Sequence, residues 1–405
     1  MPINGTFGYM RKDKYADVER ACVFSMDKEA ALPDFVCAWG EGVRQHICSN
    51  RTRSFMESNM LPHALPPRTR KIRPQSPKER KKRMEKHLQI VILERNSVGT
   101  DIDVSCFEEL GEVVCYANTV TEMEVRERIK EADIVIANKA PLREETLKDA
   151  PHVKMICEFA TGYDNCDIAY CKSRGIRVAN VVDYSTAMVA QHTFTLALAL
   201  SQKLAYYDDY VKSGRYGAQD RFSHFDVPFT ELDGKTWGII GMGHIGRKVA
   251  QIATAFGCNV IFHSITGNST VDAYRQVDKD TLFAESDFLS LHCPLSELSR
   301  NLIDKKALQK MKKTAVLINV ARGGVVNNRD LYEALMNGEI MAAGLDVLEK
   351  EPLESANPLS LIDDSNRLII TPHLAWGSVE ARSRCVKETF LNIQAFLRNE
   401  ERNLV

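Results

Sequence analysis

Residues 236–264 read TWGIIGMGHIGRKVAQIATAFGCNVIFHS, and this stretch decides what kind of fold the chain adopts. An apolar run leads into the turn GMGHIG, which opens an amphipathic segment ending at Gly257, and a second apolar run follows. In such a strand–turn–helix–strand unit, Gly241 permits the turn, Gly243 lets the backbone approach a pyrophosphate, and Gly246 lets helix and strand pack closely. The stretch therefore predicts a dinucleotide-binding unit.

The residues that follow the turn bear on which dinucleotide is bound. The amides of His244 and Ile245 open the predicted helix, where the helix dipole favours a phosphate. An NAD site usually places an acid on the ribose about 20 residues further on, but Ser264 stands there instead. Hydroxyls at Ser264 and Thr266 can hydrogen-bond a ribose or a 2′-phosphate, and the nearest arginine is Arg275. The sequence favours NAD as the coenzyme and is compatible with NADP.

Apolar runs alternate with amphipathic segments on both sides of this unit. A first series of strands is predicted over residues 89–94, 133–138, 153–158 and 177–182. A second series is predicted in KTWGIIG, NVIFHS, DFLSLHC, AVLINVA, AAGLDVL and RLIITPH. Between them, residues 185–201 form a nearly all-apolar helix of the kind that is buried. Such alternation implies parallel sheets with helices on both faces.

The chain is predicted to form two domains, because 405 residues exceed what a single core usually spans. We expect two Rossmann-like or flavodoxin-like α/β domains with parallel sheets, and an active site in the cleft between them. Residues 84–184 with 375–405, which include a last helix over 380–399, are predicted to form the substrate (catalytic) domain. Residues 185–374 are predicted to form the NAD(P)-binding domain.

The first 83 residues differ in composition from the rest. Between Pro66 and Lys86 there are ten Lys or Arg and two Glu, and the neighbouring stretch is rich in proline. Such a segment buries too little apolar surface to fold, so we predict a disordered extension. Two alternatives stay open: a basic arm for a nucleic acid or a partner, and a native start at Met84 with non-native sequence before it.

Composition excludes several classes of protein. The net charge is −1 and 26% of the residues are charged, so no global field points to nucleic acid or to a membrane. No apolar run approaches the roughly 18 residues of a membrane span. The 11 cysteines show no metal-type spacing, which predicts a reduced, cytoplasmic chain without a metal site.

Three later segments each end a predicted strand with an ionisable residue. They are NVARGG with Arg322, LDVLEKEPL with Glu351 and TPHLAWGS with His373. The carboxyl ends of parallel strands line the ligand crevice of an open sheet, so these three side chains can converge near the nicotinamide.

From about Leu88 to Asn399 the chain resembles the D-isomer-specific 2-hydroxyacid dehydrogenases. The resemblance rests on ELDGKTWGIIGMGHIG, HCPL, NVARGGVVN, AAGLDVLEKEP and TPHLAW in this order. The motifs ATGYDN and PHLAWGS resemble the glycerate dehydrogenase (hydroxypyruvate reductase) branch. The resemblance implies a homodimer that reduces a small 2-oxo acid, such as hydroxypyruvate or glyoxylate, to the D-2-hydroxy acid with hydride from NAD(P)H.

The family's catalytic residues fall on Arg322, Glu351 and His373. His373 would give a proton to the developing alkoxide, Glu351 would stabilise the charged imidazole, and Arg322 would bind the substrate carboxylate. Glu349 is a rival to Glu351, but the family motif places its acid directly before proline. Formate dehydrogenases share the fold and carry Gln at that position, so Glu351 argues against them.

Further residues match the family more loosely on the substrate side. Thr161 and Gly162 lie in FATGYDNCD, which resembles the loop whose amides hold the substrate carboxylate. Lys139 follows a predicted strand and either faces the same cleft or is solvated. Trp376 either caps the substrate pocket or packs.

The family's coenzyme contacts also carry over to this sequence. Asp346 matches the residue that binds the nicotinamide amide, with a loop acid as the alternative reading. Cys293 and Pro294 match the family's turn against the nicotinamide ribose. Val320, Ala321 and Arg322, at the end of a later predicted strand, are further expected coenzyme contacts. In the apolar helix, Gln191 and His192 lie in a region that the family uses for dimer contacts, so subunit packing competes there with a functional role.

Two other functions are compatible with these motifs. Dinucleotide-sensing transcriptional corepressors resemble the same family, and the basic N-terminal segment favours that reading. Related dehydrogenases act on bulkier branched or aromatic 2-hydroxy acids. A binding module alone would not need Arg322, Glu351 and His373 together.

Overall fold

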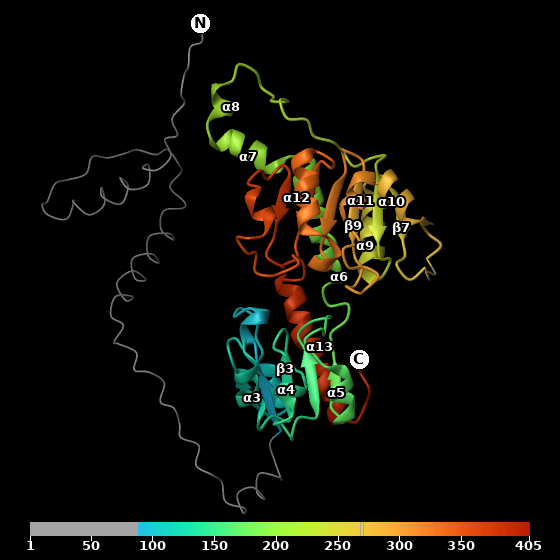
Figure 1. Ribbon diagram of the computed structural model, residues 1–405. Helices are drawn as coiled ribbons and strands as arrows, with labels where there is room; N and C mark the ends of the chain where they lie inside the picture. The colour runs from blue at the N-terminus through green and yellow to red at the C-terminus, as the bar shows by residue number, and fades with distance from the viewer. Residues whose placement is uncertain (1–87, 268, 270) are drawn as a thin grey trace, which may run out of the picture. The chain divides into compact units, whose positions relative to one another are not determined.

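The computed structural model describes residues 88–267, 269 and 271–405, which belong to one compact unit of the chain (Figure 1). The predicted N-terminal extension, residues 1–83, and the alternative start at Met84 lie outside the described residues.

The first sheet has five parallel strands in the order β2-β1-β3-β4-β5. Its strands are β1 (Gln89–Ile92), β2 (Glu112–Cys115), β3 (Ile134–Ala137), β4 (Met155–Glu158) and β5 (Arg177–Ala179). Helices α3 (Glu122–Ile129), α4 (Glu144–Leu147) and α5 (Ile168–Ser173) and the 3-10 turns η1 (Arg95–Val98) and η2 (Ser105–Glu109) connect them. This is the flavodoxin-like strand order.

The second sheet has seven parallel strands in the order β12-β11-β10-β9-β6-β7-β8. Its strands are β6 (Thr236–Ile240), β7 (Asn259–His263), β8 (Arg275–Gln276), β9 (Phe288–Leu291), β10 (Val316–Asn319), β11 (Ala342–Leu345) and β12 (Leu368–Ile370). The strand order reverses between β6 and β9, as in the Rossmann fold, and ligands bind outside the carboxyl ends of the strands at such a point.

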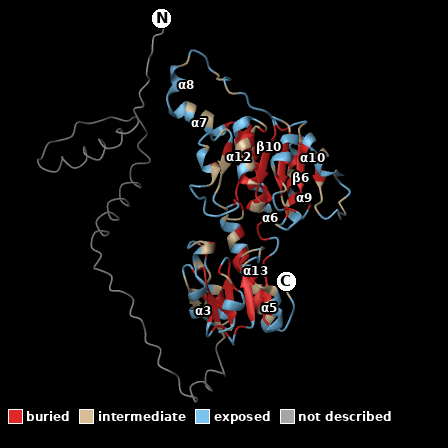
Figure 2. Ribbon diagram, in the orientation of Figure 1, coloured by how far each residue is buried: buried red, intermediate tan, exposed pale blue. Residues whose placement is uncertain are grey.

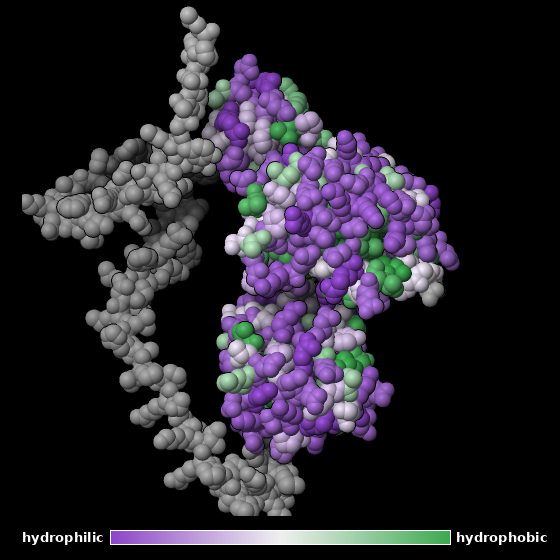
Figure 3. Space-filling model, in the orientation of Figure 1, coloured by the Kyte–Doolittle hydropathy of each residue, from purple (hydrophilic) through white to green (hydrophobic). Residues whose placement is uncertain are grey.

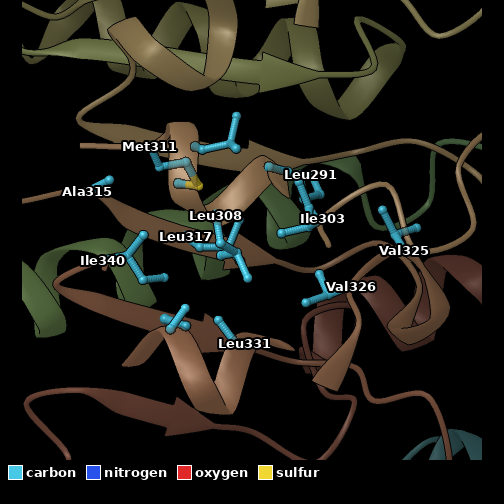
Figure 4. Close-up of a cluster of buried hydrophobic side chains, with 14 of the residues drawn as sticks. Leu291, Ile303, Leu308, Met311, Ala315, Leu317, Val325, Val326, Leu331 and Ile340 are labelled. Carbon is cyan, nitrogen blue, oxygen red and sulfur yellow. The ribbon is translucent and has the colours of Figure 1, made fainter. Parts of the chain in front are cut away.

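Helices cover both faces of the second sheet. They are α6 (Thr186–Ser201), α9 (His244–Ala255), α10 (Lys279–Glu285), α11 (Lys305–Lys310) and α12 (Asn328–Asn337), with 3-10 turns η3 (Gly323–Val325) and η4 (Pro358–Leu361). Figure 4 shows one of the two cores, in which Leu291 and Leu317 of the sheet pack against Leu308 of α11 and Leu331 of α12. The other core holds Trp237 and the buried side of α6 and α9. Figure 2 shows the strands as the buried layer.

The last helix, α13 (Val379–Leu397), packs against β4 of the first sheet. The chain therefore leaves the first sheet after β5 and returns to it after β12. The predicted fold class, an α/β fold with two parallel sheets, is confirmed. Within the described ranges, no helix has the length and apolar character needed to cross a membrane.

Helix α6 is followed by two shorter helices, α7 (Leu204–Lys212) and α8 (Arg215–Ala218). Three strands differ from the predictions. The strand predicted over 177–182 ends at Ala179 as β5. The strands β2 and β8 were not predicted. Both lie at sheet edges, are at most four residues long and have no buried position, so a search for buried strands misses them.

Candidate active site

The glycine turn has the geometry that its sequence predicts. Gly241 has a φ of 94°, and a Cβ there would lie 2.7 Å from the carbonyl oxygen of His292. A Cβ on Gly246 would overlap the carbonyl oxygen of Gly241, so the helix packs directly on the turn. At Gly243, the residue before α9, no described atom lies within 4 Å of the position of a Cβ. This open backbone at a helix N-terminus fits a dinucleotide pyrophosphate.

The other predicted coenzyme residues lie at the carboxyl ends of neighbouring strands. Ser264 directly follows β7, and Cys293 and Pro294 follow β9 beside the glycine turn. Val320 and Ala321 follow β10. The amide of buried Asn319 accepts a hydrogen bond from the backbone N–H of Ala321 and donates one to the carbonyl oxygen of Arg322, both at 3.0 Å. This side chain thereby shapes the turn that carries Arg322.

His373 and Glu351 form a hydrogen-bonded pair, with Nδ1 and Oε2 2.7 Å apart. The other oxygen of Glu351 accepts a hydrogen bond from the backbone N–H of Leu348 at 3.0 Å. Burial raises the pKa of Glu351, but these hydrogen bonds and the charges of His373 and Lys139 outweigh it, so the pKa is lowered. Glu351 is therefore ionised at neutral pH and faces the imidazole.

Glu349, the rival acid, points elsewhere. Its carboxylate accepts a hydrogen bond at 3.2 Å from the backbone N–H of Asn328, the first residue of α12. A Cβ on Gly323 would overlap the backbone of Leu348, so the turn after Arg322 packs tightly against the loop that leads to Glu351. The structure thus brings Glu351, and not Glu349, to His373.

Arg322 lies against the predicted substrate loop. Its Nη2 occupies the space that a Cβ on Gly162 would need, and its Nε lies 3.8 Å from the carboxylate of Asp164. Nη1 donates a hydrogen bond to the carbonyl oxygen of Ala321 at 2.9 Å, which helps to hold the guanidinium. The hydroxyl of Thr161 donates to the carbonyl oxygen of Val181 at 2.7 Å. Arg322 and the backbone at Gly162 are therefore close enough to contact one small ligand together.

Lys139 and Trp376 border the same region. The carboxylate of Glu94 accepts hydrogen bonds from three successive backbone N–H groups, including that of Lys139, and so fixes the loop after β3. Lys139 is exposed, and its charge is the last of the causes that lower the pKa of Glu351, so contact of Lys139 with substrate stays a prediction. Trp376 packs edge-on against Tyr184, with ring centroids 6.2 Å apart. Packing is thus the observed role of Trp376.

Asp346 is 2% exposed, and its carboxylate is engaged by the protein itself. It accepts hydrogen bonds from the hydroxyl of Thr371 at 2.6 Å and from the backbone N–H groups of Leu374 and Ala375 at 2.9 and 2.8 Å. Its carbonyl oxygen accepts from the N–H of His373. Asp346 therefore anchors the loop that carries His373, a role close to the loop-acid reading of its sequence, and contact with the nicotinamide stays a prediction.

Glu158, the last residue of β4, is a buried acid that the sequence analysis missed. Its Oε1 accepts hydrogen bonds from the side-chain amide of Asn165 at 3.1 Å and from the thiol of Cys166 at 3.0 Å, and Oε2 has no partner among the described residues. Burial raises the pKa of Glu158 to about 7. An acid at the end of the apolar strand VKMICE was the available signal. These two hydrogen bonds connect Glu158 to the loop after β4, which also carries Thr161 and Gly162.

Replacement of Glu158 by Gln should remove a pH dependence of stability. Between the ordinary pKa of 4.5 and the folded value of about 7, the unfolded chain releases a proton that the folded chain retains. Wild-type stability therefore falls as the pH rises through this range, by at most about 3 kcal/mol. Glu158→Gln should melt a few degrees higher than wild type at pH 8 and close to it at pH 5, measured by calorimetry. The exposed Glu297→Gln is the control, and equal melting of Glu158→Gln and wild type at pH 8 would contradict the prediction.

Comparisons of this chain with a family model and with known proteins all indicate the same family. The sequence model described as "D-isomer specific 2-hydroxyacid dehydrogenase, NAD binding domain" matches residues 194–375. A hydroxypyruvate reductase of Blautia hydrogenotrophica is 35% identical over 78% of this chain and 99% of its own. A glycerate dehydrogenase of Methylorubrum extorquens is 37% identical over 78% of this chain and 98% of its own.

Solved structures agree with these relatives. The chain superposes with a TM-score of 0.68 on an NADPH-dependent glyoxylate/hydroxypyruvate reductase of Sinorhizobium meliloti, solved with NADP and malonate. The two are 25% identical, and the match covers 79% of this chain and 97% of that one. The fold and site define a dinucleotide-dependent dehydrogenase. The chain belongs to the D-isomer-specific 2-hydroxyacid dehydrogenase family, as its motifs predicted.

Proposed function

We propose that this protein reduces small 2-oxo acids, such as hydroxypyruvate and glyoxylate, to D-2-hydroxy acids with NAD(P)H. The observation that carries the proposal is the hydrogen-bonded pair His373–Glu351 together with Arg322 beside Gly162. The names of the reported relatives, hydroxypyruvate reductase and glycerate dehydrogenase, support this choice of substrate. They lend no support to the corepressor alternative.

The catalytic roles follow from the chemistry of each side chain. The reduced coenzyme, when bound, supplies a hydride to the carbonyl carbon of the substrate. His373 gives a proton to the oxygen that becomes an alkoxide, and it takes that proton back in the reverse direction. Glu351 is ionised and hydrogen-bonded to Nδ1, so it orients the ring and stabilises its charged form. Arg322 binds the substrate carboxylate through its planar fork and polarises the carbonyl.

The remaining substrate contacts come from the first sheet. The backbone amides of Thr161 and Gly162 would bind the carboxylate opposite Arg322, and Lys139 would add positive charge to the same region. This assigns substrate binding to residues 84–184 with 375–405, and coenzyme binding to residues 185–374. Closure of the cleft between these domains would exclude water during hydride transfer.

The coenzyme would lie along the carboxyl ends of the second sheet. The glycine turn with His244 and Ile245 would hold the pyrophosphate. Ser264 would contact the adenine ribose. The nicotinamide end would contact the residues after β9, β10 and β11, namely Cys293, Pro294, Val320, Ala321, Arg322 and Asp346. NAD(H) is the proposed coenzyme, with NADP(H) as an alternative that Ser264 admits.

The variant Ser264→Asp tests how this chain treats the 2′-phosphate. A carboxylate at this position would repel the 2′-phosphate and could still accept a ribose hydroxyl. We expect kcat/KM for NADPH to fall at least about tenfold, and kcat/KM for NADH to change less than about threefold. The uncharged Ser264→Asn is the control. A loss of activity with NADPH in Ser264→Asn as large as in Ser264→Asp would show that charge is not the cause.

The decisive experiment is the initial rate of coenzyme oxidation with hydroxypyruvate or glyoxylate, using NADH and NADPH in parallel. His373→Ala serves as the blank. Rapid turnover that is lost in the blank would support the proposal. Turnover only with branched or aromatic 2-oxo acids would favour the dehydrogenases of bulkier substrates. An absence of turnover with every 2-oxo acid would refute the reductase.

A homodimer is proposed from the family resemblance and from the arm that carries α7 and α8 (Figure 1). Apolar side chains lie on its surface (Figure 3), and the loop after it exposes 90% of Phe222 and 72% of Phe225. Such a surface is typical of a protein interface. Sedimentation should give twice the chain mass of 45.6 kDa, and Phe222→Asp combined with Phe225→Asp should lower it.

The free cysteines of the described residues favour the reducing cytoplasm as the compartment.

A further inference from the structure

A buried histidine of α6 is not used by the proposed mechanism. His192 lies in the middle of this apolar helix and is 5% exposed. Burial lowers the pKa of His192 and the nearby Asp346 opposes this only partly, so the ring is neutral at physiological pH. A polar ring in such a place is costly unless it is hydrogen-bonded. Its Nε2 lies 2.9 Å from the hydroxyl oxygen of Thr371, just beyond β12.

The direction of this hydrogen bond follows from the single proton of the hydroxyl. Thr371 donates that proton to Oδ1 of Asp346, at 2.6 Å. The hydroxyl oxygen can then only accept from His192, so Nε2 carries the proton of the neutral ring. The distance of 3.5 Å from Nε2 to Asp346 Oδ1 is too long for a second strong bond. A chain of donations therefore runs from His192 through Thr371 to Asp346.

Asp346 in turn is hydrogen-bonded to the loop that carries the imidazole of His373. The backbone N–H groups of three successive residues, His373, Leu374 and Ala375, all donate to Asp346, the first to its carbonyl oxygen and the others to its carboxylate. His373 itself has a φ of 53°, in the left-handed region. A non-glycine residue costs about 1–3 kcal/mol there, and it stays there only because its surroundings hold it. The anchoring by Asp346 supplies that restraint.

We propose that His192 is a positioning residue: through Thr371 and Asp346 it holds the backbone at His373 in the conformation that presents the imidazole to Glu351. His192 takes no part in the proposed chemical step itself. It acts only through the loop that carries His373. Arg322 and the glycine turn lie outside this hydrogen-bond chain, and Asp346, the proposed coenzyme contact within it, keeps its bonds from Leu374 and Ala375 when His192 is replaced. The effect should therefore fall mainly on the chemical step. The inference rests on the proposed reductase function for its kinetic readout.

The test compares His192→Gln with His192→Leu in the full chain. The amide of Gln can place an N–H near the position of Nε2, whereas Leu fills the space without a donor. We expect kcat for hydroxypyruvate reduction to fall about 10- to 100-fold in His192→Leu and to stay within about threefold of wild type in His192→Gln. KM for hydroxypyruvate and Kd for NADH, from protein fluorescence, should change less than about threefold in both.

Hydrogen exchange provides a readout that needs no turnover. The amides of His373, Leu374 and Ala375 should exchange faster in His192→Leu than in wild type or His192→Gln. The inference would be overturned by equal losses of kcat in the two variants, or by wild-type kcat and exchange in His192→Leu. If the wild type reduces no 2-oxo acid, the proposed function fails, and the exchange comparison still decides the role of His192.

A second pair of variants, at Thr371, keeps the inference testable if His192→Leu does not fold. Thr371→Val removes the hydroxyl with little change of shape, and Thr371→Ser retains it. We expect the same ordering: kcat lowered about 10- to 100-fold in Thr371→Val and largely restored in Thr371→Ser. Equal kcat in these two variants would overturn the inference, because it would show that the hydroxyl of Thr371 has no effect on the position of His373.

Discussion

Replacement of His373 by Ala is expected to lower kcat for hydroxypyruvate reduction by about 10²- to 10⁴-fold, the usual contribution of a general acid. Without the imidazole, no group hydrogen-bonded to Glu351 can give a proton to the developing alkoxide. The side chain belongs to the loop after β12 and is not part of the glycine turn. Kd for NADH should therefore stay within about threefold of wild type. Stopped-flow measurement of NADH oxidation with saturating substrate gives kcat without interference from binding.

The matched control is His152→Ala, because His152 is exposed in the turn before β4. It should retain wild-type kcat. Glu351→Gln keeps the imidazole but removes the negative charge beside it, so its kcat should lie between those of wild type and His373→Ala. A kcat for His373→Ala within about fivefold of wild type would assign the proton transfer to another group and remove the central element of the proposed mechanism.

Replacement of Arg322 by Leu is expected to lower kcat/KM for hydroxypyruvate by about 10²- to 10⁴-fold. The loss corresponds to two charge-assisted hydrogen bonds to a carboxylate, each contributing about 1.5–3 kcal/mol. Most of the change should be a higher KM, since the substrate carboxylate is present in the ground state as well as in the transition state. Arg322→Lys retains the charge but loses the planar fork, and should lose only about tenfold.

Arg329→Leu is the control for Arg322→Leu. Arg329 lies on α12, its side chain is 83% exposed, and its ion-pair partner Glu333 is on the same helix. Its removal should leave kcat and KM unchanged. If Arg322→Leu raised KM for NADH and left KM for hydroxypyruvate unchanged, Arg322 would be a coenzyme contact and the carboxylate would have to bind elsewhere.

The glycine turn was predictable from the sequence because each of its requirements is local. The positive φ at Gly241, the open backbone at Gly243 and the close packing at Gly246 all arise within one strand, one turn and one helix. The same holds for the long apolar strands, whose patterns predicted two parallel sheets. The edge strands β2 and β8 are short and have no buried position, so the search for buried strands did not identify them.

The identities of Arg322, Glu351 and His373 were also predictable, because each follows a buried strand in a motif that the family shares. The family motif favoured Glu351 over Glu349, and the structure gives the physical reason for that choice. The two acids are separated by one residue, and the path of the loop after β11 sends the first to the start of α12 and the second to His373. Lys139 is exposed in the structure, and its role toward substrate stays a prediction.

The alternation of strands and helices, the dinucleotide turn and the chemical types of the active-site side chains can all be predicted from the sequence, because local pattern and backbone geometry specify them. Which polar groups are buried, and what they contact, depends on the packing of the whole fold. His192 and Thr371 are 179 positions apart in the chain, and Glu158 is enclosed by residues of a loop that folds back over its strand. Burial and hydrogen bonding depend on partners that packing brings together, and no local stretch of sequence contains both members of such a pair.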